Sequence, residues 1–353
     1  LSSSSAASDV YKRQRTMPFN VLVVGAGAVG CFYGSKLDPE HTRVSLVCRS
    51  NYELAKTQGF ELETHSFGTY QFTPHSVYAT VEEAAALASE PWDYVCVATK
   101  ALSMDLSSVE FVAPVISETT TIVLLQNGVD IEAPYRERYP RTPIISAVTV
   151  ISAAKTHPTR IVQYRWTRIS LGPYTDLHGS ATTPEARTLL NQTEDRVRDF
   201  AELLTLGGIK DVETYDALGI QLVRWHKLCI NASMNTSGVL AGGRSNPDMV
   251  RDPALRKHIE ACMHEVLEAT PSVFGCPMPD KFASPAKLLE STARNTSQSA
   301  SSMVQDWKAG HALELDAILG NAIRVAEAHG ASMPRLQSMY ALLQSAEAMR
   351  AMS

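Results

Sequence analysis

The sequence has little of what marks nucleic-acid-binding, membrane-spanning or disulfide-stabilised proteins. Its 32 basic residues are outnumbered by 37 acidic residues, so the basic excess typical of nucleic-acid binders is absent. No uninterrupted apolar run approaches the about 18 residues of a membrane span, and no apolar signal-peptide core follows the N-terminus. The six cysteines show no C-x-x-C spacing, which predicts buried thiols in a reducing compartment. We therefore expect a cytoplasmic protein that binds neither nucleic acid nor membranes.

The length of 353 residues is about twice that of a usual domain and predicts two domains. The Ser-rich residues 1–16 precede Met17, and we expect them to be a disordered or non-native extension. A mitochondrial location is the alternative if this extension is native. Strand-like patterns dominate residues 17–214 and helical patterns dominate residues 215–353, so we place the domain boundary between these ranges.

The first half alternates short apolar runs with helix-length connections, which predicts an α/β domain of the Rossmann type. Residues 60–80 contain turn residues between two strand-like runs and are interpreted as an inserted hairpin. Residues 144–172 are rich in β-branched residues, which indicates further strands. The other predicted elements are strands at 19–24, 44–48, 94–98, 121–125 and 209–214, and an amphipathic helix at 184–206.

The second half has the periodicity of helices at residues 217–241, 253–270 and 302–330, with prolines confined to starts and connections. This pattern predicts a mostly α-helical C-terminal domain. The Ser-rich segment 291–302 is consistent with a loop, a helix start or a lid.

A glycine motif, Gly25-x-Gly27-x-x-Gly30, follows the first predicted strand. The first glycine permits a tight turn, the second lets a pyrophosphate approach the backbone, and the third allows close packing of helix on strand. The helix would begin with Ala28 and Val29, whose amides would face the anion. We therefore expect a dinucleotide site, with a purely structural glycine turn as the alternative.

The end of the second predicted strand distinguishes the two nicotinamide cofactors. NAD-binding proteins place an acid there, about 20 residues beyond the glycines, for the ribose 2′-hydroxyl. This chain has Arg49 instead, and a guanidinium matches the 2′-phosphate of NADP in charge and geometry. The predicted cofactor is NADP (NADPH), with a solvated Arg49 as the alternative; no metal site is predicted.

Two series of polar residues repeat every four positions in the second half. Lys227, Asn231 and Asn235 would span only about 80° of a regular helix. Such a stripe faces either water or a polar cleft, and the spacing leaves both open. The second series would drift by about 40° per step on one continuous helix, and it consists of Ser302, Asp306, Gly310 and Glu314.

Polar residues also follow two of the predicted parallel strands. Lys100 follows the strand at 94–98, and Asn127 follows the strand at 121–125. Because open α/β sheets bind ligands at the carboxyl ends of their strands, both residues are candidate cofactor contacts. The Asn127-Gly pair is also a common turn signal, which is the alternative for this residue.

These pieces, in this order, resemble the ketopantoate reductase (2-dehydropantoate 2-reductase) family over about residues 19–345. The resemblance rests on GAGAVGCFYG, VATKA, QNGV, HKLCINASMN and SSMVQDWKAGHALELDAILGN. It implies that Lys227 is the general acid and Glu314 a catalytic-site carboxylate, on opposite walls of a cleft between the domains. It further implies substrate contacts at Asn231, Asn235, Ser302 and Asn127, and positions near the cofactor for Asn127 and Lys100.

The resemblance implies NADPH-dependent reduction of 2-dehydropantoate to (R)-pantoate, a step of pantothenate and coenzyme A synthesis, with a small 2-keto acid as the ligand and a homodimer as an expected assembly. Three departures leave the keto acid open: Ser299, where the family often has Asn; His311 and Leu313, where it has arginine and threonine; and the scarcity of glycine in residues 146–172. The alternatives are reduction of another branched 2-keto acid or an imine, and a non-catalytic NADP-binding sensor.

Overall fold

The computed structural model describes residues 17–103, 105–295 and 300–352. The described strands form a ten-stranded sheet in the order β4-β3-β9-β8-β7-β6-β1-β2-β5, with β10 beside β9. The strands are β1 (Phe19–Val24), β2 (Thr42–Val47), β3 (Phe60–Thr64), β4 (Gly68–Phe72), β5 (Val77–Tyr78), β6 (Tyr94–Val97), β7 (Thr121–Leu124), β8 (Ile144–His157), β9 (Arg160–Pro173) and β10 (Val212–Thr214).

The central strands β2, β1, β6, β7 and β8 are mutually parallel and covered on both faces. One face packs against α2 (Ala28–Ser35) and α7 (Pro184–Leu206), which contribute Phe32 and Phe200 to the core. The other face packs against α4 (Val81–Leu87), α5 (Ser107–Glu110) and α6 (Ala133–Arg138). Burial on both faces explains the nearly continuous apolar strands and confirms the predicted doubly wound α/β fold.

The elements expected beyond the central strands are present as well. The hairpin β3–β4 is antiparallel, and β8 and β9 form a long antiparallel pair with two residues of turn between them. Helix α7 begins where the sequence indicates, because Thr183 accepts a hydrogen bond from the Ala186 amide and Pro184 occupies the first turn. Helix α3 (Tyr52–Gln58) and the single turn Ala113–Val115 complete this half.

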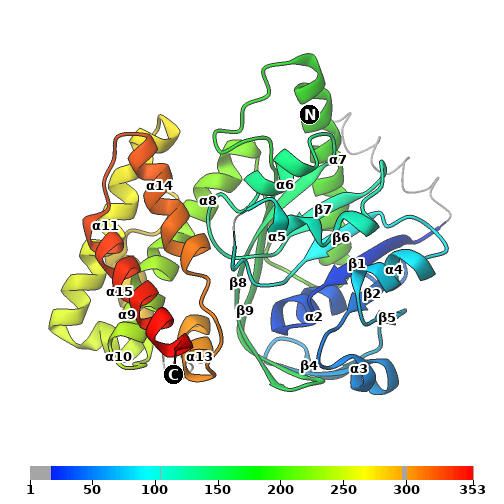
Figure 1. Ribbon diagram of the computed structural model, residues 1–353, viewed down its shortest axis with the longest axis horizontal. Helices are drawn as coiled ribbons and strands as arrows, with labels where there is room; N and C mark the ends of the chain where they lie inside the picture. The colour runs from blue at the N-terminus through cyan, green and yellow to red at the C-terminus, as the bar shows by residue number, and fades with distance from the viewer. Residues whose placement is uncertain (1–16, 104, 296–299, 353) are drawn as a thin grey trace.

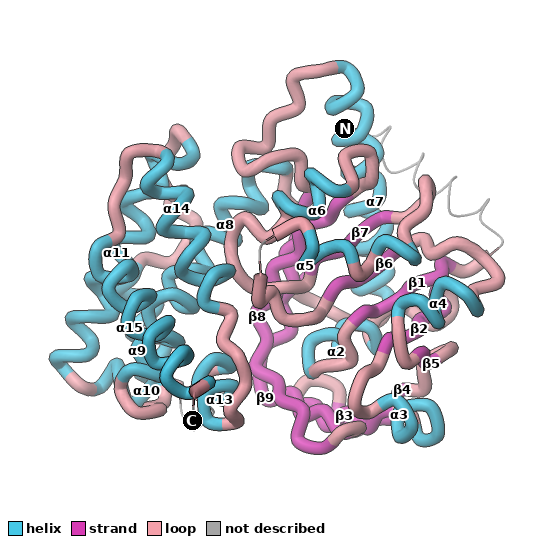
Figure 2. Tube along the Cα trace, viewed as in Figure 1, coloured by secondary structure: helices cyan, strands magenta, loops and turns pink. Residues whose placement is uncertain are grey.

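The second half is helical, as predicted, and lies to one side of β8 and β9 (Figure 1). In the tube view, the described secondary structure of this half is drawn as helix (Figure 2). Its core surrounds Trp225, whose Nε1 donates to the carbonyl oxygen of Val266 at 2.7 Å. The α-helices are α8 (Ala217–Ile230), α9 (Thr236–Leu240), α10 (Asn246–Arg251), α11 (Pro253–Phe274), α12 (Pro285–Ala293), α13 (Ser302–Lys308), α14 (Asn321–Ala328) and α15 (Pro334–Ala351).

Two expectations for this half are only partly met. The helical pattern at 217–241 is interrupted by a π-helix, Asn231–Asn235, between α8 and α9. The pattern at 302–330 does not form one helix, because α13 ends at Lys308 and Gly310 takes a left-handed φ of +71°. A second π-helix, Asp316–Gly320, then leads into α14. The four-residue series from Ser302 to Glu314 therefore does not share one helix face.

The two halves meet where the loop after β7 contacts the second π-helix. Gly128 has a φ of +105°, and an added Cβ would lie 2.5 Å from the carbonyl oxygen of Ala317. The amide of Val129 donates to that same oxygen at 3.0 Å. Val129 belongs to the core of the helical half, whereas Ala317 belongs to a core of the sheet half. Each half therefore contributes one residue to the core of the other.

Five cysteines are buried and Cys276 is half-buried, and none forms a disulfide among the described residues. No described helix is both long and apolar enough to cross a bilayer. The predicted extension at 1–16 and the departure at Ser299 lie outside the described residues.

Candidate active site

The three motif glycines differ in why glycine is needed. Gly25 has a φ of +111°, and its added Cβ would lie 2.9 Å from the backbone of Ala98. A Cβ on Gly30 would lie 2.2 Å from the carbonyl oxygen of Gly25. Gly27 is different, because its φ of -87° suits any residue and its added Cβ would meet nothing within 4 Å. Packing therefore accounts for Gly25 and Gly30, while the open space beside Gly27 fits the approach of a ligand.

Helix α2 begins at that open space. Gly27 is its N-cap and provides no side chain to accept from the first-turn amides, and Ala28 and Val29 are half-buried. Uncapped amides at a helix N-terminus suit a phosphate. Arg49 lies exposed just beyond β2, at the same carboxyl edge of the sheet. The uncapped start of α2 and Arg49 thus lie at one edge of the sheet, where the former suits the pyrophosphate of a dinucleotide.

Lys227 lies in the last turn of α8 and contacts the sheet half. Its Nζ donates to Oδ1 of Asn127 at 2.7 Å, across the boundary between the halves. Desolvation by the surrounding protein lowers the pKa of Lys227 to about 7, the nearby Arg224 lowers it as well, and Glu314 acts in the opposite sense. An ammonium that titrates near neutral pH suits proton transfer.

Glu314 reaches the same site from the other side. Its Oε1 accepts from the amide of Ala101 at 2.9 Å, next to the strand end that carries Lys100. Burial raises the pKa of Glu314, while the Ala101 amide, Lys100 and Lys227 oppose that rise. Lys227 and Glu314 each influence the pKa of the other, so the two predicted catalytic side chains lie within electrostatic range of each other.

The two predicted asparagines also share this face. Nδ2 of Asn235 donates to Oδ1 of Asn231 at 3.3 Å, and Asn235 is buried. Both lie in the π-helix that follows Lys227, where the wider turn replaces the regular spacing assumed from the sequence. The polar stripe is therefore half-buried to buried, and its first two residues line a pocket rather than an open surface.

The remaining candidates are placed less directly. Lys100 forms an ion pair with Asp306 at 2.6 Å and so joins the sheet half to α13. Ser302 is the exposed first residue of α13, and the helix contacts the site through Asp306 rather than through Ser302. Asp306 belongs to the four-residue series noted in the sequence. The sequence around it does not indicate its ion pair with Lys100, which lies 206 positions earlier.

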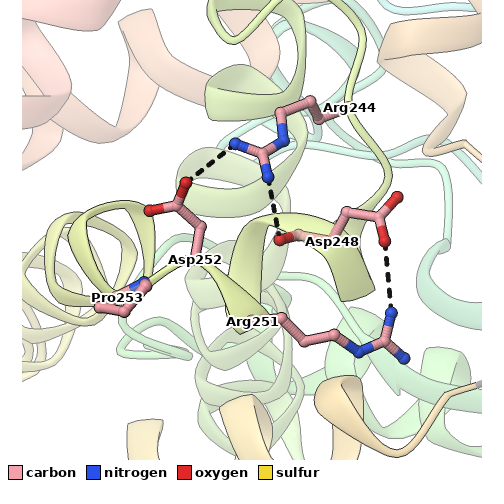
Figure 3. Close-up of a pocket in the computed structure, with 5 residues that line it drawn as sticks. All are labelled: Arg244, Asp248, Arg251, Asp252 and Pro253. Carbon is pink, nitrogen blue, oxygen red and sulfur yellow. Dashed lines mark hydrogen bonds and ion pairs between the residues drawn. The ribbon is translucent and has the colours of Figure 1, made fainter.

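A narrow pocket lies beside the Lys227–Asn127 hydrogen bond, with a cavity volume of about 10 Å³, room for about one water molecule. A larger recess of about 470 Å³ lies elsewhere, at the start of α11 (Figure 3). Its charges pair among themselves, Arg244 with Asp252 and Arg251 with Asp248. None of the candidate residues lines that recess, so we place the active site at the narrow pocket, which is lined by Asn127, Gly128, Val148, Arg224, Lys227, Leu228 and Asn231.

Comparison with known families follows the same two-part division. The family described as Ketopantoate reductase PanE/ApbA matches residues 21–176, and its C-terminal counterpart matches residues 219–347. The chain belongs to the ketopantoate reductase family. Membership assigns the chain to a family of oxidoreductases and confirms both the resemblance and the fold class, a Rossmann-type domain followed by a helical one.

Relatives in this family are similar over nearly the whole chain. An uncharacterised protein of Saccharomyces cerevisiae is 28% identical over 92% of each chain. The 2-dehydropantoate 2-reductase of Nostoc sp. is 26% identical over 90% of this chain and 92% of its own. The crystal structure of 2-dehydropantoate 2-reductase from Methylococcus capsulatus is 29% identical, with a TM-score of 0.77, and the match covers 94% of this chain and 98% of that one.

A ternary structure of D-mandelate dehydrogenase with NADH and anilino(oxo)acetate shares the fold, with a TM-score of 0.73. Its 17% identity over 94% of this chain and 99% of that one supports the architecture alone.

Proposed function

We propose that this ketopantoate reductase family member reduces 2-dehydropantoate to (R)-pantoate with NADPH, in the synthesis of pantothenate. The observation that carries the proposal is the hydrogen bond from Lys227 to Asn127 at the carboxyl edge of the parallel sheet, with Glu314 held at the neighbouring strand end by the Ala101 amide. The Nostoc and Methylococcus relatives that bear the name 2-dehydropantoate 2-reductase favour this substrate.

NADPH, when bound, supplies the hydride. Its pyrophosphate would lie over Gly27 and the first amides of α2, and Arg49 would meet the 2′-phosphate. Lys100 and Asn127, at neighbouring strand ends, would border the nicotinamide. These positions explain why glycine stands at residue 27, where nothing in the protein requires it.

Lys227 would act as the general acid. Hydride addition to a keto carbon places negative charge on the carbonyl oxygen, which a nearby ammonium stabilises and then protonates. The hydrogen bond to Asn127 aims Nζ across the boundary between the halves. Asn231 and Asn235 would orient the hydroxyl and carboxylate groups of the keto acid without adding a competing charge.

Glu314 would set the charge state of Lys227. A carboxylate near the ammonium favours its protonated form and so counteracts desolvation. This opposition keeps a proton available on Lys227 close to neutral pH. The carboxylate thereby allows a partly buried lysine to serve as an acid.

The first experiment compares initial rates of NADPH and NADH oxidation by the purified protein with 2-dehydropantoate. We expect turnover that prefers NADPH and that Lys227→Ala abolishes while NADPH binding, measured by fluorescence, is retained. Binding of NADPH without reduction of 2-dehydropantoate would overturn the substrate assignment. Other branched 2-keto acids and imines would then be assayed, and failure of all of them would favour a sensor.

The proposal includes a cytoplasmic homodimer. A dimeric ketopantoate reductase from Staphylococcus aureus has a similar fold. Sedimentation of this protein at several concentrations tests the assembly, and a monomer throughout would contradict it.

A further inference from the structure

A buried ion pair lies directly behind the proposed acid and has no part in the roles assigned so far. Nε of Arg224 lies 2.9 Å from Oε1 of Glu132, and the two side chains are 3% and 0% exposed. Arg224 comes from α8 in the helical half, whereas Glu132 comes from the loop that leads into α6. Ser146 of β8 donates to the same carboxylate oxygen and accepts from Arg224 at 2.7 Å.

The guanidinium of Arg224 is held by the protein through all three of its nitrogens. Its Nη1 donates to the carbonyl oxygens of Gln126 and Gly128, each at 3.0 Å, and its other two nitrogens contact Ser146. Four of its five N–H groups are therefore taken up by the protein, although the side chain lines the pocket. Its influence on catalysis would pass through the groups that it holds.

Those groups are the two peptide carbonyls on either side of Asn127. Fixing both of them leaves the Asn127 side chain little freedom, and that side chain accepts the hydrogen bond from Lys227. Arg224 and Lys227 are three residues apart on α8, so one helix carries both the side chain that holds the backbone around Asn127 and the ammonium that Asn127 contacts. The contacts thus form a closed loop from Arg224 through the 126–128 backbone to Asn127 and back to α8.

We propose that Arg224, anchored by Glu132 and Ser146, is a positioning residue that holds the backbone around Asn127 so that its amide oxygen orients the ammonium of Lys227. The inference rests on the proposed function only in taking Lys227 as the acid. The like charge of Arg224 also lowers the pKa of Lys227, in agreement with this arrangement.

A purely structural purpose explains the pair less well. Oε2 of Glu132 is buried without a hydrogen-bond partner among the described residues. Replacing a buried ion pair by apolar groups is often neutral or stabilising, so anchoring the halves does not by itself require charges here. A planar guanidinium, in contrast, is what can hold two carbonyls and a hydroxyl at once, which an ammonium cannot do with the same geometry.

The test is a double-mutant cycle between Arg224→Lys and Asn127→Ala. Arg224→Lys keeps the positive charge but loses the planar guanidinium that holds two carbonyl oxygens at once. We expect kcat to fall about 10- to 100-fold, with the KM for NADPH within about twofold of wild type. If Arg224 acts through Asn127, the double variant should be no slower than the slower single variant. Multiplicative losses would overturn the proposal.

Arg136→Lys is the matched control. Arg136 also holds backbone carbonyls, those of Tyr139, Pro140, Thr142 and Tyr174, away from Lys227. We expect it to lower the thermal midpoint as much as Arg224→Lys does while leaving kcat unchanged. A kcat that follows the thermal midpoint in both variants would make Arg224 merely structural.

Two measurements do not depend on the substrate. Amide hydrogen exchange at residues 126–129 should be at least about tenfold faster in Arg224→Lys than in wild type. The second measurement follows the pKa of Lys227 through its 13Cε signal, which is assigned by comparison with Lys227→Arg. In the double variant Arg224→Met with Glu132→Gln, the midpoint of this titration should be higher than in wild type. An unchanged amide exchange rate and an unchanged titration midpoint would overturn the proposal. If both change as expected but the protein reduces no keto acid, only the proposed function is rejected.

Discussion

The wall of the site that carries Lys227, the lysine wall, is supported differently from the wall that carries Glu314, the glutamate wall. The lysine wall is a regular helix, α8, backed by the buried Arg224 and Trp225. The glutamate wall is the non-helical segment 309–314 together with α13 before it, and it is tied to the sheet half by the Ala101 amide and by the partly exposed Lys100–Asp306 pair. We infer that the lysine wall sets the chemistry, whereas the glutamate wall sets how the site closes and how Lys227 is charged.

Lys227→Met should have the largest effect and would isolate the chemical contribution of the lysine wall. Losing a general acid lowers kcat by about 10³-fold, whereas NADPH affinity and the thermal midpoint should not fall, because methionine keeps the packing and removes a desolvated ammonium. Steady-state rates and calorimetry measure both. A kcat within tenfold of wild type would assign the acid to another group.

The pH profile of the wild-type protein should show the next largest effect. Lys227 has a pKa lowered to about 7, so its acid form is present below that pH and is lost above it. The kcat for reduction should then fall about tenfold per pH unit above neutrality, while oxidation of the alcohol should rise.

Lys36 is the matched control for this profile, because burial lowers its pKa to about 8 beneath the rings of Phe67 and Tyr70. Lys36→Met should leave the basic limb of the profile, which is the fall of kcat above neutral pH, in place. A limb that vanished in this variant would belong to Lys36 and not to the lysine wall.

Glu314→Gln should have a smaller effect, because it changes the charge of the glutamate wall and leaves the acid present. Glu314 raises the pKa of Lys227, so its removal should move the basic limb to lower pH and reduce kcat at neutral pH by about 10-fold. Glu347→Gln removes a carboxylate that accepts from the amide of Leu313 on the same segment, and it should not move the limb. Identical profiles for the two variants would contradict a direct influence on Lys227.

Asp306→Asn should have the smallest effect, through closure of the glutamate wall. Partly exposed ion pairs contribute little, so we expect the KM for the keto acid to rise about two- to fivefold with kcat nearly unchanged. Added salt should raise the wild-type KM toward that of the variant. Arg160→Gln, which breaks surface pairs with Glu61 and Glu63, is the control and should change neither.

The lysine wall was largely predictable from the sequence, because its signals are local. Lys227 and the asparagines after it lie in continuous helical structure, and their four-residue spacing is visible in the sequence. The end of α13 at Lys308 was not predicted. The four-residue spacing from Ser302 to Glu314 is that of one continuous helix, and only Gly310 indicated that the helix ends.

Contacts between distant residues account for what the sequence could not show. Arg224 and Glu132 are 92 positions apart, and the spacing of either residue gives no sign of the other. Lys100 was predicted as a cofactor contact from its strand end, but its partner Asp306 follows only from the way the halves are docked. The π-helix after Lys227 likewise depends on packing that no periodicity reveals.

The exchange of Val129 and Ala317 between the cores has a mechanical consequence. Gly128 lets the two backbones touch, so separating the halves at this point would open a void in both cores at once. The pocket is narrow, so we infer that the proposed keto acid enters when the halves turn about this contact while the Lys100–Asp306 pair opens. The same shared residues link the halves in unfolding, and we expect them to melt as one unit.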